Sequence, residues 1–481
     1  MTKKKTLEDY SLEQMRAELD RRWAVAHYRP GMTMSQMELL IWEEVGMESP
    51  AALRHLKVLL DHMPLEKPTG KRCPKCGKRT PVKAKDRDRT LRTMPGTITL
   101  KRNYHYCERC QLGFYPLDRL LDLPEQGELT HEMEKRVADF AVNDVYEQGA
   151  DRWNLHYREP ISDNLLRRVA ARLGGQCEAA DQGQLQEALK PSTEVADALV
   201  VQMDGSLLPI RGAEPWKEAK VGVTYRHDTE RNRSIRGSER YCAVVGTVAN
   251  FAPVFEELLV AERIDEVRTV IWLGDGASHN WTLADQIAAE AVQILDWYHA
   301  VEHAVDCGKA LLDEESPFLP LWKQRAETLL AEGDPEVLIR ELMDCIPEVE
   351  RRRRKDKPEA LKAIDDLVRY YRTNIRRMKY RQFRESGYPI GSGAVESAHR
   401  HVLQCRMKRA GQRWGLQNAR RMAHLRAAYR TAGVSRFYEA IQHARRQTER
   451  GEVRRHGRRH GFHFARQGER DRARARISAS K

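Results

Sequence analysis

Three acidic residues in this 481-residue chain have the residue type and the sequence setting of divalent-metal ligands. Asp204 ends the apolar run 198–203, and Asp275 ends a second apolar run, 270–274. Glu396 follows a Gly-Ser-Gly segment that leads into a long basic stretch with helical periodicity. Two strand-terminal aspartates and one helical glutamate are the ligands of a two-metal phosphoryl-transfer centre, with ions about 4 Å apart. The sequence therefore predicts these three residues as catalytic ligands of two Mg2+ (or Mn2+) ions.

Two Cys-x-x-Cys pairs predict a second metal site with a different ligand chemistry. The four cysteines are Cys73, Cys76, Cys107 and Cys110. Each pair brings two thiolates to one ion from a tight knuckle, and two knuckles complete a tetrahedral zinc site. The segment 97–106 between the pairs alternates like a β-strand, as in a zinc ribbon. We expect one structural Zn2+ ion here, and His105 is an alternative ligand.

The positive charge of the chain is unevenly distributed. The 83 Lys and Arg exceed the 70 Asp and Glu by 13. Residues 400–430 contain nine Lys and Arg and no acid, and residues 445–481 contain 13 Lys and Arg and four acids. The two stretches more than account for the net charge, so the remainder of the chain is slightly acidic. Concentrated positive charge indicates a polyanionic partner, most commonly nucleic acid.

The sequence predicts a cytoplasmic protein, most simply a bacterial one associated with the nucleoid. No stretch approaches 18 consecutive apolar residues, so no membrane span is expected. The basic residues near the N-terminus have no apolar core behind them, which argues against a signal peptide. The other five cysteines are scattered, a pattern that favours a reducing compartment over a disulfide scaffold.

Short β-rich runs begin at about residue 195, and their order predicts a mixed sheet. They lie at 198–204, 219–226, 240–248, 268–274 and 292–296. Helical patterns follow the third and the fourth runs. This order resembles that of an RNase H-like sheet, in which the first and fourth strands are neighbours. We therefore expect the carboxylates of Asp204 and Asp275 to converge.

The whole chain is expected to be an α+β multidomain protein. The predicted parts are an N-terminal helical region (1–66), a zinc-ribbon-like four-cysteine module (67–127), a helical region with a possible helix-turn-helix for DNA binding (128–190), the first part of the RNase H-like catalytic core (195–297), an all-helical insertion (298–388), the second part of the core with its Glu-bearing helix (389–432), and a basic C-terminal tail (433–481).

Several segments of the chain resemble DDE transposases of bacterial insertion sequences. They are the runs 202–205, 216–222, 273–277 and 296–299, and the stretch 390–414 with its Ile-Gly-Ser-Gly-x-x-Glu-Ser motif. The likeness is to the Mutator-related group, whose RNase H-like core is interrupted by an all-helical insertion before the glutamate. That group has a Cys-or-Asp-x-x-His signature, which Asp296 and His299 match. The resemblance implies that Asp204, Asp275 and Glu396 form the metal-binding triad.

Asp296 and His299 allow two interpretations at the level of sequence. His299 could orient a water molecule or a phosphate, or it could be a packed residue beside the sheet. The basic residues that follow Glu396 are predicted to contact DNA phosphates near the active site. They are Arg406, Lys408, Arg409, Arg413, Arg420 and Arg421.

These features together predict a transposase that binds the terminal inverted repeats of its element, nicks DNA to expose 3′-hydroxyls and joins them to target DNA. Two ends must be processed together, so a homodimer or larger assembly on double-stranded DNA is expected. A zinc-containing DNA-binding regulator descended from a transposase and an RNase H-like nuclease are the alternatives.

Overall fold

The computed structural model describes residues 11–47, 49–63, 71–125, 127–190, 197–212, 215–312, 314–351 and 357–457. The predicted basic tail lies outside the described residues from 458 onward. The chain divides into two compact units: one comprises Met1–Phe140, Tyr146–Leu166 and Gln442–Lys481, and the other comprises Ala141–Val145 and Arg167–Ile441. The protein has an α+β fold with a mixed sheet, many helices and a cysteine cluster near the N-terminus, as predicted.

The first unit begins with three helices, α1 (Leu12–His27), α2 (Met34–Glu44) and α3 (Ala52–His62). Helices α1 and α2 begin at capping boxes formed by Ser11 and Thr33, which satisfy backbone N–H groups of the first turn. Leu56 and Leu59 of α3 are buried with Leu91 and Ile98 of a long hairpin. The predicted N-terminal helices are therefore packed on a β-hairpin that carries the cysteine module.

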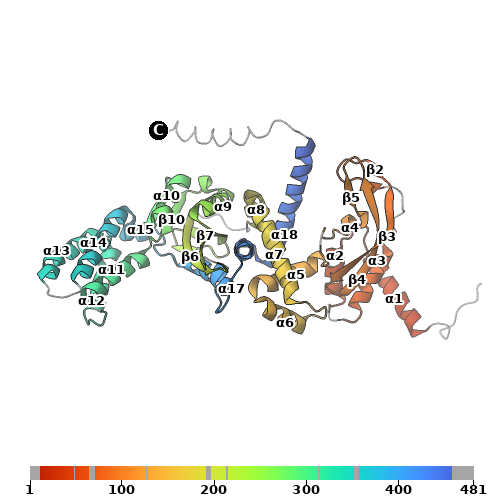
Figure 1. Ribbon diagram of the computed structural model, residues 1–481, viewed down its shortest axis with the longest axis horizontal. Helices are drawn as coiled ribbons and strands as arrows, with labels where there is room; N and C mark the ends of the chain where they lie inside the picture. The colour runs from red at the N-terminus through yellow and green to blue at the C-terminus, as the bar shows by residue number, and fades with distance from the viewer. Residues whose placement is uncertain are drawn as a thin grey trace, which may run out of the picture. The chain divides into compact units, whose positions relative to one another are not determined.

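The strands of the first unit form two small antiparallel sheets (Figure 1). Their strands are β1 (Lys71–Arg72), β2 (Arg79–Thr80), β3 (Val82–Thr93), β4 (Gly96–Cys107) and β5 (Leu112–Phe114). Strand β4 confirms the predicted strand at 97–106. Three helices follow: α4 (Pro116–Leu120), α5 (His131–Asn143) and α6 (Tyr146–His156).

The predicted helix-turn-helix region contains α6 and α7 (Asp163–Ala179), followed by α8 (Gln182–Leu189). Ser162 caps α7, because its Oγ accepts a hydrogen bond from the backbone N–H of Leu165 at 3.3 Å. One of the boundaries between the two compact units falls inside α7. The helices are present as predicted, and DNA binding by them stays a prediction.

The second unit contains a six-stranded mixed sheet in the order β11-β10-β6-β7-β8, with β9 also paired to β7 (Figure 1). The strands are β6 (Ala198–Pro209), β7 (Trp216–Asp228), β8 (Arg233–Ser234), β9 (Arg240–Val245), β10 (Thr269–Gly274) and β11 (Val292–Leu295). Strand β7 runs antiparallel to β6, β8 and β9, whereas β10 runs parallel to both β6 and β11. The five predicted β-rich runs all correspond to strands of this sheet.

Asp204 does not end its strand, which corrects the sequence prediction. Pairing of β6 with β10 stops at Gln202, but pairing with β7 continues to Pro209. The apolar run ends before Asp204 because the strand residues are buried without interruption only up to Met203. Backbone hydrogen bonds with β7 nevertheless continue beyond Asp204. Asp204 and Gly205 therefore lie in extended backbone rather than in a turn.

Helices cover both faces of this sheet. Phe255 of α9 (Val248–Ala261) packs so closely on Gly222 that a Cβ there would lie 2.5 Å from its ring. The other face receives α16 (Gly393–Ala398), because the backbone N–H of Val395 donates to Gln202 Oε1 at 2.9 Å. Gln202 and Asp204 share a face because successive strand residues alternate between faces. Asp204 therefore lies on the face covered by α16.

The segment between β11 and α16 contains helices joined by turns and loops, and none of its described residues forms a strand (Figure 1). It contains α11 (Trp297–Leu312), α12 (Leu319–Glu332), α13 (Pro335–Arg351), α14 (Lys357–Asn374) and α15 (Tyr380–Glu385). Helix α10 (Ser278–Ile287) connects β10 to β11. The buried residues of α11–α15 belong to the same hydrophobic core as the sheet.

The chain after α16 continues through a π-helical turn (His399–Gln404) and α17 (Cys405–Met407) into the long helix α18 (Leu416–Gly457). Gly433, with φ of 71°, interrupts α18 at the boundary predicted between the core and the tail. None of the helices in the described parts of the chain is long and apolar enough to cross a membrane.

Candidate metal centres

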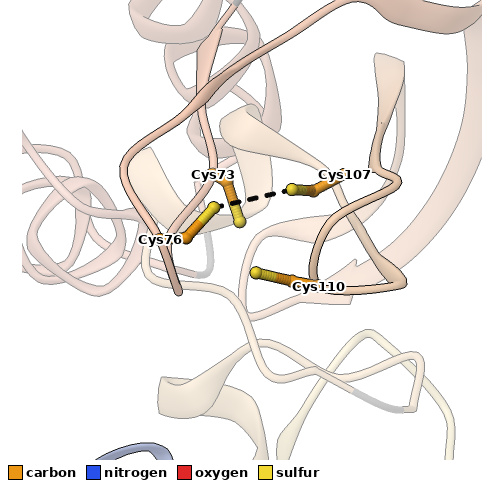
Figure 2. A group of neighbouring side chains, drawn as sticks. All are labelled: Cys73, Cys76, Cys107 and Cys110. Carbon is orange, nitrogen blue, oxygen red and sulfur yellow. Dashed lines mark hydrogen bonds between the residues drawn. The ribbon is translucent and has the colours of Figure 1, made fainter. Parts of the chain in front are cut away.

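The four cysteines predicted to bind zinc converge in space (Figure 2). Their Sγ atoms all lie within 4.8 Å of one another, and those of Cys76 and Cys107 are 3.7 Å apart. Ligands about 2.3 Å from a tetrahedral zinc ion are separated by about 3.8 Å. The sulfur positions therefore fit a structural metal such as zinc.

Local backbone geometry explains how the first knuckle forms. Gly77 has φ of 70°, which glycine adopts without a Cβ penalty, and its N–H donates to the carbonyl of Cys73 at 2.9 Å. The backbone N–H of Lys75 donates to Cys73 Sγ at 3.4 Å. His105 lies outside the sulfur cluster, because its Nδ1 is 3.3 Å from the carbonyl oxygen of Thr80. The cysteine set is thus complete without the alternative ligand.

The thiols of the cluster influence one another electrostatically. A hydrogen bond from the Lys78 backbone lowers the pKa of Cys76 to about 7. The nearby thiol of Cys76 raises the pKa of Cys110 to about 12. Four thiolates this close are stable only when a cation neutralises their charge, so loss of protons and metal binding must occur together.

Asp204 and Asp275 are positioned by two neighbouring parallel strands of the second unit. The last paired residues of β10 and β6 are Leu273 and Gln202, and each aspartate follows its paired residue by two positions. The aspartates therefore leave the strand pair at the same edge. Burial lowers the pKa of His279, and the negative charges of Asp204 and Asp275 both oppose this effect. His279 is therefore within electrostatic range of both carboxylates.

Asp275 is fixed by contacts on both its side chain and its backbone. Its Oδ1 accepts hydrogen bonds from the Ala277 backbone at 3.0 Å and from Asn280 Nδ2 at 2.8 Å. The hydroxyl of Tyr370 donates to its backbone carbonyl at 2.9 Å. Gly276, with φ of 92°, allows the sharp turn that follows. These contacts orient one carboxylate oxygen and leave the other for a further partner.

Glu396 reaches the same side of the sheet from α16. The contact between Val395 and Gln202 anchors α16 to the strand that carries Asp204. Glu396 itself is exposed, and its Oε1 lies 3.3 Å from the hydroxyl of Ser392. The three carboxylates are not among the described ligand groups whose atoms all lie within 4.8 Å of one another. Asp204 and Asp275 share a sheet edge, and Glu396 lies on the helix that covers the face of Asp204.

Buried Asp296 and partly exposed His299 form a pair next to the loop that leads to Glu396. Asp296 is 0% exposed, and its Oδ2 lies 2.7 Å from His299 Nδ1 and accepts a hydrogen bond from Ser392 Oγ. The hydrogen bond to Asp296 raises the pKa of His299 to about 9. The backbone N–H of Trp297 also donates to the carbonyl of Ile390 at 2.9 Å. Asp296 therefore links the end of β11, the start of α11 and the loop that precedes the helix of Glu396.

Two residues near Asp204 were not singled out in the sequence. His399 is 4% exposed, and its Nε2 is 3.4 Å from Asp204 Oδ2. Lys220 is 1% exposed, and its Nζ is 2.7 Å from Glu218 Oε1 and 3.5 Å from His279 Nε2. Position 399, three residues after Glu396, places His399 on the same side of the helix, which is the only sequence signal that could have found it.

The predicted DNA contacts differ in their exposure. Arg413 is exposed, and Lys408, Arg409, Arg420 and Arg421 are partly buried. Burial lowers the pKa of Lys408, and the charge of Asp204 opposes this effect. Arg406 is only 1% exposed, with its guanidinium carbon 5.0 Å from the centre of the Trp414 ring. Packing on Trp414 therefore removes Arg406 from the exposed basic surface, and its contact with DNA phosphates stays a prediction.

The fold and the two sites define an α+β protein with a four-cysteine metal site and a second set of acidic residues at a sheet edge. Residues 71–443 match the family model described as Uncharacterised protein family (UPF0236), and the chain belongs to this family. A comparison with curated proteins found no match. The matched range includes both the cysteine cluster and the three carboxylates.

Proposed function

We propose that this protein is a DNA transposase of the DDE type, which cleaves and joins DNA strands at the ends of an insertion sequence. The observation that carries this proposal is the placement of Asp204 and Asp275 at one edge of two adjacent parallel strands. Glu396 lies on a helix tied to the first of these strands. Acidic residues in this setting are suited to metal-dependent phosphoryl transfer.

The strand order supports an RNase H-like core for the second unit. In chain order, the first three major strands are β6, β7 and β9, and they pair antiparallel; the fourth and fifth, β10 and β11, add in parallel beside β6. This gives the order 3-2-1-4-5, which agrees with the sequence expectation. The helices α11 to α15 between β11 and the helix of Glu396 support the insertion that the resemblance to the Mutator-related group implies.

The residues of the proposed centre have separable roles. Two bound divalent ions would lower the pKa of the attacking water or 3′-hydroxyl and stabilise the leaving 3′-oxygen. Asp204, Asp275 and Glu396 would hold these ions. Asn280 and the Ala277 backbone orient Asp275, and Gln202 positions the helix of Glu396. No covalent bond between protein and DNA is required.

The proposed partner is double-stranded DNA, both as terminal inverted repeats and as target. The charge of Asp204 acts on Lys408, so a phosphate contact from this lysine would lie close to the centre. Arg413 adds an exposed cation in the loop before α18. The helices at 128–190 and the four-cysteine module are candidates for recognising the ends of the element. Processing of two ends favours a dimer or larger assembly.

A cleavage assay with labelled DNA tests the proposal. Purified protein with Mg2+ or Mn2+ should nick DNA that carries the inverted repeats flanking the gene, and then join the exposed 3′-ends to target DNA. Asp204→Asn and Glu396→Gln should each reduce cleavage by about 10³-fold or more. Glu439→Gln, at an exposed position on α18, is the matched control and should retain activity.

The alternative functions predict different outcomes in the same assay. A nuclease would cleave without joining strands, and a regulator would bind the repeats without cleaving them. Full activity of Asp204→Asn or Glu396→Gln would show that the proposed centre is wrong. Absence of inverted repeats near the gene would argue against transposition.

A further inference from the structure

The surroundings of His399 place an imidazole nitrogen beside Asp204. Its Nε2 lies 3.4 Å from Asp204 Oδ2 and makes no hydrogen bond of normal geometry within the described part of the chain. His399 is buried, with only 4% of its surface exposed. A buried polar atom without a partner is uncommon and often marks the position of an ion or an ordered water molecule.

The separation between the two side chains fits joint ligation of one cation. Two ligands about 2.1 Å from one ion are about 3.0 Å apart at a right angle and about 3.4 Å apart at a tetrahedral angle. The distance between His399 Nε2 and Asp204 Oδ2 lies at the upper end of this range. A hydrogen bond of this length would be weak, because N–H···O bonds centre near 2.9–3.0 Å.

The other ring nitrogen of His399 is arranged as a metal-binding histidine requires. Its Nδ1 lies 3.2 Å from the hydroxyl oxygen of Ser206. A proton on Nδ1, donated to this oxygen, would leave the Nε2 lone pair directed at the Asp204 carboxylate. Ligating histidines in proteins almost always donate their second ring N–H in this way. Ser206 and Asp204 lie two residues apart on β6, so both face α16.

The helix that carries Glu396 also brings His399 to the site. The residues are three positions apart, so they lie on one side of the helix, and His399 begins the π-helical turn. Single π-helical turns widen a helix locally and are frequent at functional sites. This turn directs His399 at the strand, while Glu396 remains exposed on the preceding turn.

We propose that His399 is a nitrogen ligand, together with Asp204, for one divalent ion of the centre. The biological role of this ligand rests on the proposed function, whereas the metal-binding test does not depend on it. Imidazole ligands suit first-row transition ions, whereas Mg2+ prefers an all-oxygen shell. The site should therefore bind Mn2+ more tightly than three carboxylates alone would, and His399 should set this preference over Mg2+.

Metal binding without DNA tests the ligand assignment. The full chain, with zinc in its cysteine site, is titrated with Mn2+, and free Mn2+ is counted by electron paramagnetic resonance. His399→Gln should weaken Mn2+ binding about 10- to 100-fold and weaken Mg2+ binding less. His401→Gln is the matched control, because His401 is exposed two residues further along the same turn. It should leave both affinities unchanged.

Electron spin-echo measurements supply a spectroscopic signature that a purely structural role would not produce. Bound Mn2+ in the wild type should show coupling to a histidine nitrogen, and labelling histidine with 15N should change that coupling. The coupling should vanish in His399→Gln and persist in His401→Gln. Unchanged Mn2+ affinity in His399→Gln, or no nitrogen coupling in the wild type, would overturn the proposal.

Three further variants keep the test decisive if His399→Gln does not fold. His279→Gln, His299→Gln and His303→Gln each remove one of the imidazoles on which the charge of Asp275 acts. Nitrogen coupling that persists in all three variants would assign the signal to His399, and its loss in any of them would refute the assignment. Nitrogen-coupled Mn2+ in a protein that neither cleaves nor joins DNA would uphold the ligand and reject the transposase proposal.

Discussion

At the scale of single residues, the centre depends on a buried carboxylate that the proposed chemistry does not use directly. Asp296 accepts hydrogen bonds from His299, from Ser392 and from the Tyr298 backbone, the last at 2.9 Å. The sequence left its role open between catalysis and packing. Complete burial and three donors favour a positioning role, because a group this enclosed cannot reach DNA in the structure described.

Replacing Asp296 should therefore destabilise the folded protein and loosen the loop that precedes the helix of Glu396. Asp296→Asn places an amide where two donors point, and we expect the free energy of unfolding to fall by about 2–3 kcal/mol. Denaturant unfolding of the zinc-loaded protein measures this loss. Asp306→Asn is the control on the same helix, since Asp306 is exposed and forms an ion pair with Lys309 one turn further on. It should be indistinguishable from the wild type.

The His299 ring provides an independent readout of the same variant. Its pKa of about 9 is raised mainly by the hydrogen bond to Asp296, so it should fall toward its ordinary value in Asp296→Asn. The protonated ring stabilises the folded state below about pH 6.5, and this contribution is lost as the pH rises through 9. The difference in free energy of unfolding between the wild type and Asp296→Asn should accordingly decrease above pH 9. An unchanged His299 titration by NMR would contradict the pairing.

At the scale of elements, one buried carboxyl joins three segments of the first unit. Glu38 of α2 accepts a hydrogen bond from the Met94 backbone in the β3–β4 turn at 2.7 Å. It accepts another from the hydroxyl of Thr130, just before α5, at 3.0 Å. Burial raises the pKa of Glu38 to about 8, and the hydrogen bonds from Met94 and Thr130 only partly oppose this. The connection between these elements thus uses a protonated carboxyl at neutral pH.

The stability of the first unit should decrease as the pH rises between about 4.5 and 8. The unfolded chain loses the Glu38 proton near 4.5, whereas the folded chain keeps it to about 8, so folding takes up a proton in this interval. The maximum loss is about 5 kcal/mol, at about 1.4 kcal/mol per pKa unit. Glu38→Gln should remove this dependence and become progressively more stable than the wild type toward pH 8.

Denaturant unfolding of both proteins at pH 5.5 and 8.5 measures this difference. Glu13→Gln, at an exposed position on α1, is the control and should follow the wild type at both values. If Glu38→Gln differs from the wild type by the same amount at both pH values, Glu38 does not carry the pH dependence.

At the scale of the whole molecule, the two compact units should respond differently to loss of zinc. The cysteine site closes the short hairpin β1–β2 against the end of β4, and all four ligands belong to the first unit. Structural zinc binding is worth about 10–16 kcal/mol in small zinc domains. Removal of the metal should therefore unfold the region from β1 to β5 and leave the mixed sheet of the second unit folded.

Hydrogen exchange before and after chelation checks this expectation. Amides of residues 71–114 should lose protection, whereas those of β6, β7 and β10 should keep it. Cys107→Ser should lose bound zinc, and Cys405→Ser, at an exposed cysteine of α17, should retain it. Equal loss of protection in both units would show that they do not fold separately.

The sequence alone determined the features that are written locally along the chain. The spacing of the cysteine pairs indicated their cluster, and the β-rich runs located every major strand of the sheet. Each of these depends on contacts within a few residues or on a repeating pattern of burial, so no knowledge of distant neighbours is needed.

Only the tertiary structure decided how distant side chains share one environment. The extension of β6 past Asp204 depends on the length of β7, and burial of Arg406 depends on Trp414. The approach of His399 to Asp204 requires α16 to lie on the sheet, with Gln202 bonded to Val395. Such pairings are set by register and packing between elements far apart in sequence, and the type of a residue does not encode them.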